Sequence, residues 1–77
     1  FTTLRYDLPE ASHVRIMIYD LMGRKIRTLV DMDQKAGYRS IQWNATNDLG
    51  QPVSAGIYLY MIQARDFRQT KKMVLLK

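Results

Sequence analysis

The sequence predicts an all-β domain with the architecture of an antiparallel β-sandwich, and three features of the chain support this fold class. Apolar and polar residues alternate along several stretches, which is the pattern of a half-buried strand. Groups of glycine, proline, asparagine and aspartate separate these stretches at short intervals, as turns do between strands. No stretch of useful length has the period of about 3.6 residues that an amphipathic helix requires.

The first two strands are expected on either side of Pro9, whose ring leaves no backbone N–H for a sheet ladder. Alternation over residues 3–8 predicts the first strand, and alternation over about residues 13–19 predicts the second. The residues of these two strands that we expect in the core are Tyr6, Val14, Ile16 and Ile18.

The third strand is expected at about residues 24–30, after a tight turn with Gly23 at its tip. Glycine tolerates the positive φ that a short hairpin turn requires, so this residue suits the tip. The inward side of the strand is expected to carry Ile26 and then either Leu29 or Val30.

A polar segment with a glycine, residues 31–37, predicts a loop before the fourth strand. That strand is expected at about residues 38–44. Ile41 and Trp43 lie two positions apart, so they share one face, and we expect both in the core.

Residues 44–56 carry the strongest turn signal of the chain, and two apolar runs follow it. The run over residues 57–64 is apolar on both faces, which predicts a central strand or one covered on its second side. Tyr60 and Ile62 are its expected core residues, and residues 67–76 form the last strand. Six such strands predict an immunoglobulin-like or fibronectin-like antiparallel β-sandwich of six to seven strands.

The composition limits the possible functions. A chain of 77 residues is expected to form a single domain over residues 1–77, and its start at Phe1, without an initiator methionine, predicts a piece of a longer protein. With one histidine and no cysteine, the chain has no ligand set for a zinc site of those residues. The net charge is +5, but the cations are scattered, so we expect no nucleic-acid partner. We also expect no metal and no cofactor.

Catalytic residues are not expected either. His13 follows Ser12 at the start of a strand, with no acid evidently paired to it, which predicts a surface residue rather than a nucleophile–base pair. The oxygen-rich residues 44–50 could surround Ca²⁺, but they hold one carboxylate, so a hydrogen-bonded turn is the expected structure. A sugar-binding platform could be formed by the aromatic residues Tyr6, Tyr38, Trp43, Tyr58 and Tyr60, although the spacing of Trp43, Tyr58 and Tyr60 favours the core.

Three segments together suggest a family: RYDLPEASHVRIMIYDLMGRKIRTLV, AGYRSIQWNATNDLGQPVSAGIYLY and FRQTKKMVLLK. They resemble the C-terminal sorting domain (type A) of proteins exported by the type IX secretion system. The chain also resembles the immunoglobulin-like module of the flagellar hook-capping protein, which is related in fold. The resemblance covers nearly all of the chain.

The sorting-domain resemblance implies a C-terminal signal that directs an exported parent protein through the outer membrane. The parent would pass the periplasm, meet the outer-membrane secretion machinery, and reach the cell surface or the medium. There the signal is commonly cleaved, and many parents are attached to lipopolysaccharide. A catalytic or adhesive domain would lie upstream, and the sorting domain itself would not be an enzyme. The residues that match the recognition elements of the family are Pro52, Gly56, Tyr58, Lys72, Met73, Val74, Leu75, Leu76 and Lys77.

The final strand has two possible uses. If it lies at a sheet edge, a strand of a partner can pair with its free backbone groups, and its lysines can attract an acidic receptor. Alternatively, the strand closes the sandwich and the lysines only keep it soluble. Two other functions remain open for the domain: a carbohydrate- or protein-binding accessory module, and a structural scaffold like the hook-capping protein.

Overall fold

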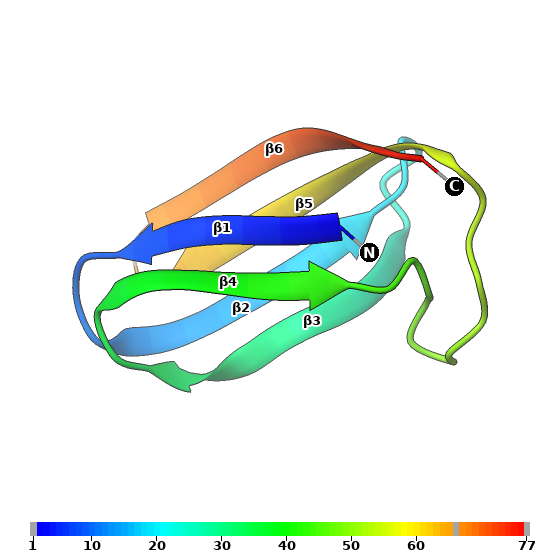
Figure 1. The fold of residues 1–77 in the computed structure, drawn as a ribbon. Helices are drawn as coiled ribbons and strands as arrows, with labels where there is room; N and C mark the ends of the chain where they lie inside the picture. Colours follow the sequence, from blue (N-terminus) through cyan, green and yellow to red (C-terminus); the bar gives the residue numbers. More distant parts are fainter. Residues whose placement is uncertain (1, 66, 77) are drawn as a thin grey trace.

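The computed structural model of the chain describes residues 2–65 and 67–76, which form two packed β-sheets (Figure 1). The strands are β1 (Thr2–Leu8), β2 (Ser12–Tyr19), β3 (Lys25–Gln34), β4 (Gly37–Trp43), β5 (Gly56–Ala64) and β6 (Phe67–Leu75). The predicted all-β sandwich is therefore confirmed. In the described part of the chain, no helix is both long and apolar enough to cross a membrane.

The two sheets differ in width. One contains β1 and β4, and the other contains four strands in the order β3-β2-β5-β6, with antiparallel pairing throughout. The strand expected to be central, β5, does lie inside the larger sheet, between β2 and β6. Each of these two layers contributes one apolar face to the core, as in other sandwiches.

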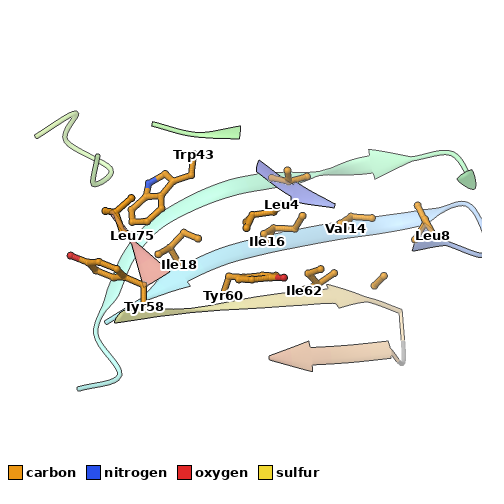
Figure 2. Packing of buried hydrophobic residues seen from close by; sticks show 12 residues of the cluster. Leu4, Leu8, Val14, Ile16, Ile18, Trp43, Tyr58, Tyr60, Ile62 and Leu75 are labelled. Carbon is orange, nitrogen blue, oxygen red and sulfur yellow. The ribbon is translucent and has the colours of Figure 1, made fainter. Parts of the chain in front are cut away.

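The core lies between the two layers, and its side chains line up along the length of the sandwich (Figure 2). Most of the expected core residues are buried: Val14, Ile16, Ile18, Trp43, Tyr60 and Ile62. Other buried members of the core are Leu4, Leu8, Val30, Tyr58, Ala64 and Leu75.

Two expected core residues, Tyr6 and Ile41, are only partly buried and pack against the core from its margin. Both lie in the two-stranded sheet, which is narrower than the sheet that it covers. The margin suits Tyr6, because its hydroxyl donates a hydrogen bond of 2.6 Å to Oε1 of Gln34 on β3.

The loop predicted at residues 31–37 is wrong over most of its length, because β3 continues to Gln34. Polar residues sit opposite polar residues here: Arg15 pairs with Asp31, and His13 pairs with Asp33. Cross-strand charge pairs thus replace apolar alternation as the signal for a strand. The register of β2 and β3 also shifts between Ile16 and Met17, which interrupts the alternation of inward and outward side chains on β3.

Candidate functional site

The edge strand β6 is the first candidate surface, because among the described strands it pairs only with β5. Its second edge therefore offers free backbone donors and acceptors to another strand. Arg68, Lys71 and Lys72 are exposed along it, and residues 67–76 contain no carboxylate. The edge is thus basic along most of its length.

The terminal half of β6 has one buried face and one exposed face. Leu75 is buried and Met73 packs against the core, whereas the exposed fractions of Val74 and Leu76 are 58% and 85%. The end of the strand therefore closes the sandwich and also presents apolar side chains outward. Both uses considered for this strand are compatible with its geometry. Lys77 lies outside the described residues.

The Gly-x-Tyr element, Gly56 and Tyr58, lies directly beside this terminal segment. Gly56 is opposite Leu75 in the ladder, and Tyr58 is opposite Met73. The φ of Gly56 is 148°, which side chains with a Cβ rarely adopt, so this position favours glycine. The element thus anchors the start of β5 to the end of β6.

The aromatic side chains of this region belong to the core. Trp43 is fully buried, and its ring meets that of Tyr58 edge-to-face, with 5.3 Å between the ring centroids. The indole Nε1 donates to the carbonyl of Thr46 at 2.8 Å, and the Tyr58 hydroxyl donates to the carbonyl of Ser54 at 2.7 Å. Figure 2 shows both rings with Leu75 at one end of the core. Neither ring forms a flat exposed platform for a sugar.

The segment between β4 and β5 is held by hydrogen bonds within the domain, as expected of a structured turn. Asn47 Oδ1 accepts from the backbone N–H groups of Leu49 at 3.0 Å and Gln51 at 2.9 Å. Asp48 Oδ1 accepts from the N–H of Thr28 on β3 at 3.0 Å. These side-chain oxygens already accept hydrogen bonds from backbone N–H groups, which would compete with a cation for them.

Pro52 lies in the same segment and is exposed. Its backbone forms an isolated antiparallel bridge with Thr46, which brings the two sides of the loop together before β5 begins. Pro52 thus belongs to the ordered segment that leads into Gly56, the first residue of β5.

His13 forms a polar cluster with two aspartates that the sequence analysis did not predict. The expectation that His13 has no paired acid is therefore wrong. Its Nε2 lies 2.5 Å from Asp31 Oδ1, and its Nδ1 lies 2.9 Å from Asp33 Oδ1. The hydrogen bonds to Asp31 and then Asp33 raise the pKa of His13, and the bond to His13 lowers the pKa of Asp31. Both ring nitrogens face carboxylates, so the ring is held away from the role of base for Ser12.

The sequence profile of the FlgD Ig-like domain matches residues 2–66. The chain belongs to the FlgD Ig-like domain family. No curated protein sequence matches the chain significantly.

A solved structure of FlgD from P. aeruginosa is similar to this FlgD Ig-like domain, with 22% sequence identity and a TM-score of 0.75. The similarity covers 95% of this chain and 59% of that FlgD chain, so the domain spans little more than half of its relative. At this identity, the similarity shows a shared fold.

The sequence match to the FlgD Ig-like family ends just before β6 begins. The profile therefore accounts for β1 to β5, and the basic terminal strand lies outside the matched residues. In contrast, six of the nine recognition residues that the sorting-domain resemblance implies come after residue 66 in the sequence, beyond the matched residues.

Proposed function

We propose that this FlgD Ig-like domain is a C-terminal sorting and translocation signal. It directs a parent protein from the periplasm through the outer membrane to the cell surface or the medium. Its partner is the outer-membrane secretion machinery, and a catalytic or adhesive domain precedes it in the parent. After cleavage of the signal, the parent can be attached to lipopolysaccharide. The domain itself does no catalysis.

One observation carries the proposal: the terminal strand β6 lies at a sheet edge, is basic, and has exposed apolar residues at its end. An edge strand supplies backbone hydrogen bonds to a receptor, and its outward side chains supply specificity. Its inward residue Leu75 ties this signal to the folded core. A receptor that binds β6 would therefore recognise this strand only in the folded domain.

The test is a fusion of a signal peptide, a fluorescent reporter and residues 1–77, expressed in a host with type IX secretion machinery. We expect the reporter at the cell surface or in the medium. Removal of residues 72–77 should retain it in the periplasm. Because this truncation also removes Leu75 from the core, a second variant is needed.

The double variant Val74→Glu and Leu76→Glu changes only exposed side chains of the terminal segment. We expect it to fold and to be retained in the periplasm. The control is Tyr38→Glu, which alters an exposed side chain on β4 and should be exported normally. Periplasmic retention of the unmodified fusion would refute the proposal.

The family match favours a second candidate, a structural accessory module. The family takes its name from FlgD, and the resemblance of the chain to the hook-capping protein suggests a scaffold role. In this role the chain would associate with itself or with a structural partner. Sedimentation velocity at rising concentration tests this candidate, because a chain that stays monomeric throughout gives no support to self-assembly.

A further inference from the structure

A cleft of about 560 Å³ opens between β1 and the first half of β6. Its apolar lining includes Tyr6, Leu8, Ile62 and Phe67. Arg5 and Lys71 line it as well and bring positive charge to its walls. The cleft is thus apolar at its base and charged at its rim, as many peptide-binding grooves are.

The cleft exists because the two sheets do not cover one another at this side. Among the described strands, β1 pairs only with β4 and β6 only with β5, so each has a free edge here (Figure 1). Phe67, Gln69 and Lys71 share a face of β6 with Met73 and Leu75. The first three are exposed, whereas Leu75 is buried. The core-facing side of β6 is therefore uncovered over residues 67–71.

The charge around this gap is unbalanced. Glu10 is also in the lining, but its carboxylate pairs with Arg65 at 3.2 Å. Within the described residues, Arg5, Arg68 and Lys71 have no carboxylate within ion-pair distance. Asp7 is the remaining acid of the lining. The free edge of β6 and its groove thus favour an anionic occupant.

We propose that this cleft binds an extended, acidic segment of a partner protein, which adds to the free edge of β6 as a further strand of the larger sheet. Alternate side chains of that segment would enter the cleft and contact Tyr6 and Phe67. The side chains between them would face the other side of the sheet, where their carboxylates would pair with Arg68. The partner strand would supply the cover that residues 67–71 lack.

A second copy of the chain fits this edge poorly. Pairing of two β6 edges would place Arg68, Lys71 and Lys72 of one copy beside the same cations of the other. Like charges on adjacent strands repel, and natural sheets use edge lysines to prevent such pairing. The cations of β6 therefore disfavour pairing with a second copy of the chain and favour pairing with an acidic strand. This inference goes beyond the sorting proposal, because it concerns binding by the isolated domain and the opposite half of β6.

The experiment uses the 77-residue chain and a fluorescent, end-capped peptide of alternating glutamate and valine. Binding is measured by fluorescence anisotropy at low and high salt, and mapped by amide chemical shifts. We expect saturable binding that weakens with salt, and shifts concentrated at residues 5–8 and 67–71. A peptide of alternating lysine and valine should not bind.

Two further comparisons separate strand addition from general charge attraction. Arg68→Glu should weaken binding of the acidic peptide by about tenfold, whereas Lys25→Glu, which makes the same change of charge on β3, should leave it unchanged. Two N-methylated peptides test for backbone pairing, one methylated at the valine amides and the other at the glutamate amides. Successive N–H groups of a strand point to opposite edges, so each peptide blocks one edge of the added strand. The peptide that is blocked at the edge facing β6 should lose binding.

Absence of saturable binding, equal binding of the lysine peptide, or shifts outside the cleft would overturn the proposal. So would equal effects of Arg68→Glu and Lys25→Glu, or undiminished binding of both methylated peptides. The sorting fusion is read separately. Export that persists when peptide binding fails refutes only the cleft, and binding that persists when export fails refutes only the sorting role.

Discussion

At the scale of single residues, Trp43 connects the turn before β5 to the core. Its ring is fully buried against Tyr58, and its Nε1 is satisfied by the carbonyl of Thr46. A small domain has a thin margin of stability, since it buries a smaller share of its surface than a large one. A single large side chain therefore carries much of the stability.

We expect Trp43→Ala to lower the free energy of unfolding by about 3–5 kcal/mol, which is enough to leave much of the chain unfolded. Trp43→Phe keeps an aromatic ring but loses the indole hydrogen bond, so it should cost less. Urea denaturation followed by circular dichroism measures both variants. Unchanged stability of Trp43→Ala would contradict the position of this residue in the core.

His13 predicts a pH dependence of stability. Its pKa is raised above 6.5 by Asp31 and Asp33, so its contribution is present below pH 6.5 and is lost as the pH rises through the raised value. The pKa of Asp31 is lowered below 3.8, so its contribution is present above pH 3.8 and is lost as the pH falls through the lowered value. The cluster therefore stabilises the fold most between about pH 4 and 6.5.

The test compares the melting temperature of the parent chain and of His13→Gln between pH 5 and 9. We expect the parent to lose more stability than the variant as the pH rises, because glutamine has no proton to release. The difference should be small, since the cluster is exposed to solvent. Parallel curves for the two proteins would show that His13 does not couple to folding.

At the scale of elements, the segment between β4 and β5 acts as a clamp on β3. Asp48 binds the N–H of Thr28 through its side chain, and its own N–H donates to the carbonyl of Ile26 at 3.1 Å. Asn47 orders the turn that positions Asp48. The loop is thus part of the folded structure.

Asn47→Ala should lower the free energy of unfolding by about 1–2 kcal/mol, because two backbone N–H groups lose their acceptor. Amide hydrogen exchange at Leu49 and Gln51 should become faster. Asn44→Ala is the control, since its side chain bonds only the hydroxyl of Thr46 and should matter less. Slow exchange in Asn47→Ala would argue against the clamp.

The terminal strand β6 has two faces with different roles, and matched alanine variants separate them. Leu75→Ala should lower the free energy of unfolding by about 2–5 kcal/mol, because its side chain is buried. Val74→Ala should change it by less than about 0.5 kcal/mol, because its side chain faces solvent. Thermal denaturation measures both. Similar values would mean that the strand end is not anchored in the core.

At the scale of the whole molecule, the unequal widths of the sheets explain most of the surface. A sheet of two strands cannot cover one of four strands, so Tyr6 and Ile41 lie at the margin and the cleft opens beside β6. The cations of β6, Arg68, Lys71 and Lys72, lie at one edge of the larger sheet, whereas the paired cluster of His13 lies on β2 and β3.

Much of this fold could be predicted from short stretches of sequence. Alternation or an apolar run indicated each of the six strands, and turn chemistry identified Gly23, which has a φ of 84°. The spacing of Trp43 from its neighbours was enough to place it inside. The choice between Leu29 and Val30 stayed open, because it depends on a bulge in the pairing of β2 with β3. Val30 is the buried one of the two.

The sequence by itself determined the presence of six strands, most of the turns between them and the inward residues of β2 and β5, because these depend on residues close together in the chain. The tertiary structure decided which acids meet His13, how far β3 extends, and where the cleft opens beside β6. These features depend on register and on the cover of one sheet by another. Both are contacts between strands that are distant in sequence, and no local pattern records them.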